Sequence, residues 1–257
     1  MKTIILAGGW GTRLGRQTEE IPKPMVPIGN RPILWHIMKI YSCYGFNDFI
    51  ISCGVKAHVL KNYFVNYDSV NEDFTIDMVN QKIEYHSNHN EKDWKVTLID
   101  TGLNTLKGAR IKRVVKYLAD DINMVTYGDG VGDINIKDLI KFHKTQGTLA
   151  TVTSVQPPGR FGSLDIEHGK ITAFKEKPQG EGSSINGGFF VLSPRIIDYI
   201  SNDNTVWEDE PLEKLAQEGQ LSAFQHKGFW QPMDTLRDKI MLNELWASGK
   251  APWKVWE

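Results

Sequence analysis

The chain has 257 residues, of which 40% are hydrophobic and 24% are charged, and its 30 basic and 31 acidic residues leave a formal net charge of −1 at neutral pH. This composition is that of an ordinary globular protein and excludes the disordered and fibrous classes. The balance of charge gives no bulk attraction to nucleic acid or to an anionic membrane, so any phosphate site must be local. We therefore expect neither nucleic acid nor a membrane as a partner.

The apolar run that opens the chain, Thr3 to Ala7, is too short for the core of a signal peptide or for a membrane span. No later apolar run reaches spanning length, so a cytoplasmic location is the expectation. The length fits one α/β domain with insertions. We predict a single domain over residues 1–257.

Hydrophobic periodicity in the first quarter of the chain predicts alternating strands and helices. Such alternation favours a parallel sheet with right-handed crossover connections. The predicted elements are a strand at 2–7, a helix at 32–43, a strand at 48–53 and a helix at 56–67.

Residues 68–101 break this rhythm. The segments 74–78, 82–85 and 95–99 alternate in polarity like exposed antiparallel strands. We predict a β-rich insertion over 68–101, a candidate for oligomer contacts.

The alternation resumes after the insertion, and the whole pattern predicts the α/β class with a mostly parallel central sheet flanked by helices and carrying antiparallel insertions. A hairpin is expected where two short strands flank His168-Gly169. The remaining predicted helices are 106–118, 136–146, 194–200, 210–217 and 235–247, and the remaining strands are 122–127, 149–155, 163–166, 170–175 and 188–192.

Glycines cluster directly after the first predicted strand, in the run Leu6-Ala7-Gly8-Gly9-Trp10-Gly11-Thr12-Arg13. Glycine lets a backbone approach a ligand closely and point its amides at anionic oxygens, so the run predicts a phosphate-binding loop with Arg13 as its cation. The run lacks the Gly-Lys-Ser/Thr ending of a Walker A loop, and Leu14 replaces the third glycine of a dinucleotide fingerprint. The alternative is a plain glycine turn between a strand and a helix.

A single lysine, Lys23, follows within an extended segment that Pro22, Pro24 and Pro27 stiffen. A rigid backbone holds an ammonium in place at little entropic cost. A solvated loop lysine is the alternative.

Further along the chain, Asp129 follows a predicted strand, which places it at the carboxyl edge of the sheet, where open α/β folds bind ligands. The alternative for Asp129 is a turn residue before Gly130.

These motifs resemble the sugar-1-phosphate nucleotidyltransferases, whose signature is Leu-Ala-Gly-Gly-x-Gly-Thr-Arg followed by Pro-Lys-Pro-Met. Further similar segments lie at 127–130, 174–178, 186–190 and 228–235. Together with the length and the Trp-Lys-x-Trp-Glu ending, they resemble the branch that uses CTP and glucose 1-phosphate. The resemblance implies a Rossmann-like nucleotidyltransferase fold, a Mg²⁺ cofactor and a homo-oligomer, with a hexamer among the candidate states. It also implies a role in making dideoxysugars of the lipopolysaccharide O-antigen.

The resemblance also implies roles for individual residues. The implied catalytic residues are Arg13, Lys23 and Asp129, and the implied magnesium ligands are Asp129 and Asp234. The implied nucleotide-binding residues are Leu6, Ala7, Gly8, Gly9, Gly11, Thr12, Gly108, Arg110 and Gly128. The implied sugar-phosphate-binding residues are Glu176, Lys177, Asn186 and Gly187.

Three of these roles have structural alternatives. Asp234 is a candidate N-cap of the last helix. Arg110 shares its predicted helix with several basic residues that form a solvated face, and Lys177 precedes a proline in a segment typical of loops.

The reaction implied is an in-line attack by glucose 1-phosphate on the α-phosphorus of CTP, with release of pyrophosphate. A uridylyl- or thymidylyltransferase is the first alternative, since the glycine loop does not distinguish the bases. A metal-dependent glycosyltransferase and a catalytically inactive nucleotide sensor are the others.

Overall fold

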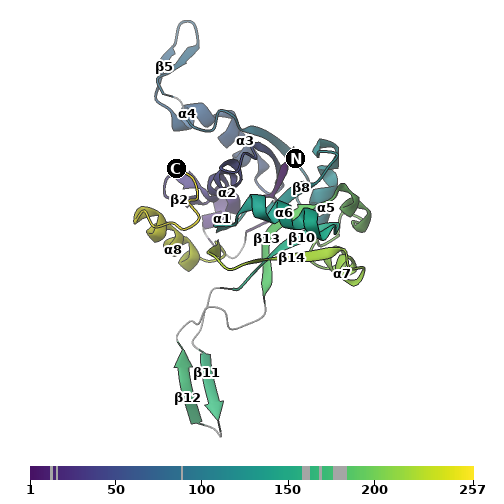
Figure 1. Cartoon of the computed structure of the whole chain (residues 1–257). Helices are drawn as coiled ribbons and strands as arrows, with labels where there is room; N and C mark the ends of the chain where they lie inside the picture. Colours follow the sequence, from purple (N-terminus) through teal and green to yellow (C-terminus); the bar gives the residue numbers. More distant parts are fainter. Residues whose placement is uncertain (12–13, 16, 88, 158–162, 168–169, 176–183) are drawn as a thin grey trace.

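A computed structural model describes residues 1–11, 14–15, 17–87, 89–157, 163–167, 170–175 and 184–257 of the chain (Figure 1). Its centre is a seven-stranded sheet with the order β14-β10-β13-β8-β1-β4-β7. The strands are β1 (Thr3–Leu6), β4 (Asp48–Cys53), β7 (Lys95–Asp100), β8 (Asn123–Tyr127), β10 (Ala150–Val155), β13 (Ile185–Leu192) and β14 (Leu221–His226). Only β13 runs antiparallel to its neighbours, so the predicted mostly parallel sheet is confirmed.

Helices cover both faces of this sheet because consecutive strand side chains point to opposite faces. On β1, Ile5 packs into the core under one group of helices, whereas Ile4 and Leu6 pack into the core under the other. The first group is α2 (Ile33–Ser42), α3 (Ala57–Val65), α6 (Ile136–Gln146) and α8 (Leu236–Ala247). The second is α5 (Lys107–Arg113), the 3₁₀ helix η4 (Pro194–Tyr199) and α7 (Glu210–Gln217). No helix in the described ranges is long and apolar enough to cross a membrane.

The short helices are α1 (Gln17–Glu20), η2 (Lys23–Met25), α4 (Tyr67–Asn71) and η3 (Val115–Tyr117). Four two-stranded ribbons add to the central sheet. They are β2 (Pro27–Ile28) with β3 (Arg31–Pro32), β5 (Phe74–Asp77) with β6 (Lys82–Tyr85), β9 (Gly130–Gly132) with β15 (Trp230–Pro232), and β11 (Ser163–Glu167) with β12 (Lys170–Lys175). The β9–β15 ribbon joins segments about a hundred residues apart in the chain, and the sequence did not predict it.

The predicted insertion divides into two parts. Residues 74–77 and 82–85 form an exposed antiparallel hairpin, as predicted, and it projects from the body of the protein (Figure 1). The strand at 95–100 does not belong to it, and the prediction of an antiparallel strand there is wrong. This strand pairs in parallel with β4 as the last strand of the central sheet. Its side chains are half-buried or exposed, and an edge strand of that kind has the same alternating polarity as a free hairpin.

A buried histidine joins the carboxyl-terminal segment to the core. The rings of Trp35, Trp246, Trp253 and Trp256 surround His36 on α2. His36 Nε2 lies 3.0 Å from the carbonyl oxygen of Ile28, and Nδ1 lies 3.4 Å from the indole nitrogen of Trp253. The indole N–H can only donate, so Nδ1 accepts and Nε2 carries the proton. Burial lowers the pKa of His36 to about 4, so the imidazole is neutral.

We expect this neutral histidine to make stability dependent on pH. In the unfolded chain the pKa is near 6.5, so between pH 6.5 and about 4 the unfolded chain binds a proton that the folded chain does not. The contribution of the neutral His36 to the free energy of unfolding is therefore complete above pH 6.5 and is lost as the pH falls toward 4. It amounts to about 3 kcal/mol. NMR titration of the His36 ring and urea unfolding across this interval measure the effect.

The His36→Gln variant is the control, because its amide does not ionise. Its free energy of unfolding should depend less on pH over the same interval. A ring that titrates near pH 6.5 in the folded wild-type protein would contradict the assignment.

Candidate functional site

The glycine run and Asp129 meet at one edge of the sheet. Strands β1 and β8 are parallel neighbours, and the last residue of each, Leu6 and Tyr127, are partners in register. The amide of Gly128 donates to the carbonyl oxygen of Leu6 at 3.1 Å. A Cβ on Gly128 would lie 2.8 Å from that oxygen, so the close approach of the two chain segments requires glycine here. The loop after β1 and the turn after β8 therefore lie side by side.

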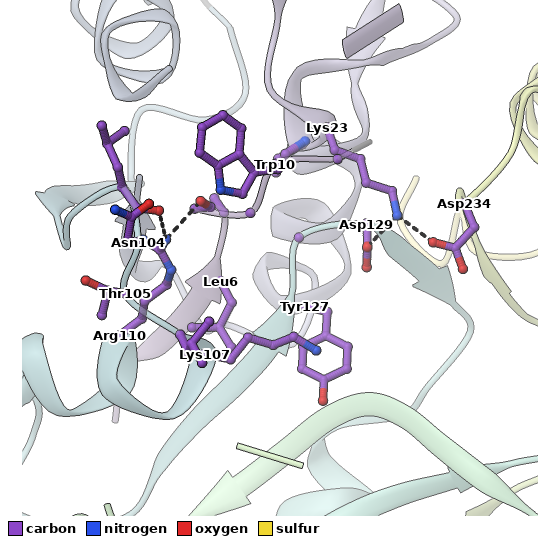
Figure 2. A pocket seen from close by; sticks show the side chains of 18 residues that line it. Leu6, Trp10, Lys23, Asn104, Thr105, Lys107, Arg110, Tyr127, Asp129 and Asp234 are labelled. Carbon is purple, nitrogen blue, oxygen red and sulfur yellow. Dashed lines mark hydrogen bonds and ion pairs between the residues drawn. The ribbon is translucent and has the colours of Figure 1, made fainter. Parts of the chain in front are cut away.

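A cavity of about 570 Å³ opens at this edge (Figure 2). The glycine run forms one wall, and the segment that leads into α5 forms another. The lining residues are Leu6, Ala7, Gly8, Gly9, Trp10, Gly11, Lys23, Pro24, Leu103, Asn104, Thr105, Leu106, Lys107, Arg110, Tyr127, Gly128, Asp129 and Asp234. Of the described residues predicted to bind nucleotide, only Gly108 is absent from this lining. Gly108 packs instead against the backbone of Thr205, to which its amide donates at 3.1 Å.

A second cavity of about 220 Å³ adjoins the first. It includes Asn186 and Gly187, both predicted to bind the sugar phosphate. The residues that line both cavities are Lys107, Tyr127, Asp129 and Asp234. The site is therefore a cleft in two parts, with acidic and basic side chains at the junction.

Lys23 joins the two predicted metal ligands at that junction. Its ammonium lies 2.6 Å from Asp129 Oδ2 and 2.7 Å from Asp234 Oδ1 (Figure 2). Lys23 comes from η2, Asp129 from the turn between β8 and β9, and Asp234 from the segment after β15. The β9–β15 ribbon brings the two aspartates together, because Gly130 pairs with Pro232 and the amide of Met233 donates to the carbonyl oxygen of Asp129. Residues far apart in sequence thus meet around one cation.

The two carboxylates keep this lysine charged. Burial by itself lowers the pKa of Lys23, but attraction to Asp129 and Asp234 and hydrogen bonds with both raise the pKa above its ordinary value of 10.5. The ammonium side chain is 12% exposed, so it is a fixed cation beside the larger cavity.

The structure decides between the alternatives for the two aspartates. The N-cap of α8 is Thr235, which forms a capping box with Asp238, so the interpretation of Asp234 as the N-cap is wrong. The carboxylate of Asp234 faces Lys23 instead. Asp129 does lie in a turn, between β8 and β9, and its carboxylate reaches Lys23. Its role as a magnesium ligand stays a prediction.

Arg110 lies against the glycine run and donates hydrogen bonds to the backbone there. Its guanidinium donates to the carbonyl oxygens of Gly8 at 3.0 Å and Cys53 at 3.1 Å, and to the hydroxyl of Thr101 at 2.6 Å. Arg110 is 4% exposed, so the interpretation of this residue as part of a solvated helix face is wrong. Burial lowers the pKa of the guanidinium below its ordinary value. Its predicted contact with the base stays a prediction.

A second group of side chains, absent from the predictions, surrounds Asn186. The amide nitrogen of Asn186 donates to the hydroxyl of Tyr127 at 3.0 Å, and that hydroxyl donates to Glu208 at 2.6 Å. Glu208 also forms an ion pair with Lys107. The indole of Trp230 donates to the carbonyl oxygen of Gly187 at 2.7 Å. The Tyr-Gly-Asp-Gly motif pointed to the position of Tyr127, whereas no local pattern pointed to Glu208.

Four predicted site residues lie outside the described residues, namely Thr12, Arg13, Glu176 and Lys177. Their roles stay predictions.

Known proteins resemble this chain over its whole length. The model of the nucleotidyl transferase family matches residues 2–244. A glucose-1-phosphate cytidylyltransferase from Salmonella typhi is 57% identical, and a probable glucose-1-phosphate cytidylyltransferase from Bacillus subtilis is 44% identical, each over 100% of both chains. The crystal structure of HddC from Yersinia pseudotuberculosis complexed with GMP-PN superposes with a TM-score of 0.70 and 26% identity over 95% of this chain and 99% of that one. The chain therefore belongs to the nucleotidyl transferase family.

Proposed function

We propose that the chain transfers a cytidylyl group from CTP to glucose 1-phosphate and yields CDP-glucose and pyrophosphate. The observation that carries this proposal is the two-part cleft, with Lys23, Asp129 and Asp234 grouped where its parts join. Such a cleft suits two anionic substrates that react with each other. Full-length similarity to cytidylyltransferases that act on glucose 1-phosphate supports the choice of substrates.

The reaction is an in-line attack by a phosphate oxygen of glucose 1-phosphate on the α-phosphorus of CTP, with the bond to the pyrophosphate oxygen breaking. A phosphomonoester has a second pKa near about 6 and is mostly dianionic at neutral pH, so the nucleophile needs no general base. The protein has instead to bring two anions together and to stabilise charge on the oxygens around phosphorus.

The residues of the cleft divide this task. The amides of the glycine run bind the phosphates that leave as pyrophosphate, and Arg13 supplies a cation beside them. The Lys23 ammonium stabilises charge at the α-phosphate. Asn186, Gly187 and Glu176 bind the hexose, and Lys177 binds the incoming phosphate. In the larger cavity the segment from Leu103 to Arg110 faces the base.

Asp129 and Asp234 suit a magnesium ion. Both carboxylates turn toward one cation, the ammonium of Lys23, and Mg²⁺ prefers carboxylate and phosphate oxygens. Within the described part of the chain no group of three or more His, Cys, Asp or Glu side chains is placed to hold a metal, so phosphate oxygens would complete the coordination at this pair. When bound, the ion supplies positive charge to the phosphates.

We further propose that the protein acts in the cytoplasm as a homo-oligomer and supplies CDP-glucose for O-antigen dideoxysugars. The family resemblance supports this role.

The substrate proposal predicts pyrophosphate release from one pair above all others. Purified protein is assayed with each of the four ribonucleoside triphosphates and dTTP, against glucose 1-phosphate and other hexose 1-phosphates, with Mg²⁺ present. CTP with glucose 1-phosphate should be the fastest pair. A faster reaction with UTP or dTTP would show that CTP is not the preferred nucleotide and would contradict that part of the proposal. Hydrolysis or transfer from CDP-glucose without any exchange of pyrophosphate would indicate a glycosyltransferase.

Removal of the central cation should slow the chemical step. Lys23→Met is expected to lower kcat by roughly 100- to 1000-fold, the usual cost of one group that stabilises transition-state charge. Lys116→Met is the control, because it removes the same charge from an exposed side chain on η3, outside both cavities. Equal rates for the two variants would exclude Lys23 from the chemistry.

The glycine run gives a prediction for stability. A Cβ on Gly8 would lie 2.1 Å from Arg110 Nη1. The guanidinium cannot move away without breaking its hydrogen bonds to the carbonyl oxygens of Gly8 and Cys53. Overpacking of this kind costs about 1–3 kcal/mol, so Gly8→Ala should lower the free energy of unfolding by that amount. Gly9→Ala is the matched control, since no described atom lies within 4 Å of its Cβ position. Urea unfolding of both variants measures the difference, and equal stabilities would contradict the packing.

A further inference from the structure

Lys107 lines the cleft, and the proposed reaction gives its ammonium no role of its own. It is the first residue of α5 and lines both parts of the cleft. Its ammonium lies beside the Tyr127 ring (Figure 2), 4.6 Å from the ring centre, and it forms an ion pair with Glu208. The side chain is 51% exposed. A positive charge therefore stands at the junction of the two cavities.

A chain of hydrogen bonds fixes this charge. Asn186 donates to Tyr127, and Tyr127 donates to the same carboxylate oxygen of Glu208 that receives Lys107. The carboxylate of Glu208 can only accept, so the phenol of Tyr127 is the donor in this hydrogen bond. Among the described residues, the other oxygen of Glu208, Oε2, is buried without a hydrogen-bond partner. The carboxylate is thus held between the phenol and the ammonium.

The two lysine ammonium groups among the described residues of the cleft differ in how many donors they can offer to a ligand. Two aspartates enclose Lys23, whose side chain is 12% exposed. Lys107 is half exposed and has one carboxylate partner in its ion pair. An ammonium has three donors, so Lys107 can keep Glu208 and still donate to a ligand oxygen in the cleft.

One group of the two substrates must extend across the junction. The triphosphate and its base can lie in the larger cavity, and the hexose can lie in the smaller one beside Asn186. The phosphate of the sugar phosphate has to reach from the hexose to the α-phosphorus, so it passes the boundary that Lys107 and Tyr127 share.

We propose that Lys107 binds the attacking phosphate of the sugar phosphate where the two cavities join, and that Glu208 is the positioning residue for this lysine. The proposal rests on the proposed function for the identity of the second anion. It adds a substrate-binding residue to the cleft and gives Glu208 a role through Lys107.

A purely structural role for this ion pair predicts a different result. A half-exposed pair contributes little to stability, with a typical value of about 0–1 kcal/mol. Removal of Lys107 should then leave the kinetic constants for both substrates unchanged. Steady-state kinetics with each substrate varied in turn can therefore separate the two roles.

The first test compares Lys107→Met, Lys107→Arg and the control Lys116→Met. Lys107→Met should raise the KM for glucose 1-phosphate about tenfold, as expected for loss of one charged hydrogen bond. Its KM for CTP should stay within about twofold of the wild-type value, which is less than the loss of a contact with CTP would cause. Lys107→Arg should recover most of the affinity, and Lys116→Met should behave as wild type. A Lys107→Met enzyme with an unchanged KM for glucose 1-phosphate would overturn the proposal, as would an equal rise for both substrates.

The second test is a double-mutant cycle with Glu208→Gln, whose amide oxygen can still accept from Tyr127. If Glu208 acts by positioning Lys107, Glu208→Gln should raise the KM for glucose 1-phosphate in the wild-type background and have no further effect in Lys107→Met. Additive effects would show that Glu208 acts independently of the lysine. Salt gives a further readout, because the KM of Lys107→Met should depend less on ionic strength than that of wild type.

Failure of the two proposals can be told apart. If the wild-type protein releases pyrophosphate from another pair of substrates, the substrate assignment fails, and the same variants are compared on that pair. If the wild-type protein has the proposed activity and Lys107→Met matches it in every constant, the proposal for Lys107 alone fails.

Discussion

The contact of one ammonium with two carboxylates determines how the cleft is built. Asp129 and Asp234 carry like charges and would repel each other without a cation between them, and Lys23 supplies it at 2.6 and 2.7 Å. The contact fixes η2 against the turn after β8 and against the segment that leads into α8. It also keeps two acidic groups close together at low net charge, as the proposed magnesium site requires.

The backbone of the cleft depends on a second buried cation, Arg110. Parallel pairing of β1 with β4 and β8 brings the ends of three strands to one edge. There the carbonyl oxygens of Gly8 and Cys53 accept hydrogen bonds from the backbone amides of Val55 and Thr101, and the guanidinium of Arg110 donates to both oxygens as well. Arg110 thereby ties the glycine run to the end of β4. The absence of a side chain at Gly8 and Gly54 leaves room for the guanidinium. The glycines of this run are therefore required by the packing of Arg110 against them, in addition to the proposed binding of phosphates.

Features set by local pattern were predictable from the sequence, and features set by distant pairing were not. The strand at 48–53 and the helices at 136–146 and 210–217 appear where periodicity placed them, because each carries its own pattern over one full element. The β9–β15 ribbon has three residues in each strand and exists through pairing across a hundred residues, too little for a local signal. The parallel direction of β7 likewise depends on its neighbour β4.

The same distinction applies to the site. Lys23 and Asp129 could be singled out because a motif surrounds each of them. For Asp234 the sequence left two interpretations open, a metal ligand and an N-cap. Thr235 beside it is the N-cap, and both residue types suit that position. Arg110 looked like one basic residue among several on a helix, and only the packing of α5 against β1 reveals that it is buried. Glu208 enters through its contacts with Tyr127 and Lys107, and neither partner is near it in sequence.

The arrangement of the cleft separates the reaction from the choice of substrates. In the proposed reaction the phosphates meet at the junction, where residues from two other segments of the chain, Asp129 and Asp234, hold Lys23. The wall proposed to face the base is the segment from Leu103 to Arg110, and residues at the start of β13 line the smaller cavity. Side chains in these two places can vary without breaking the contacts of Lys23. If the proposed roles hold, a change of base or hexose specificity requires substitutions in these two places and leaves Lys23 and its two carboxylates in contact.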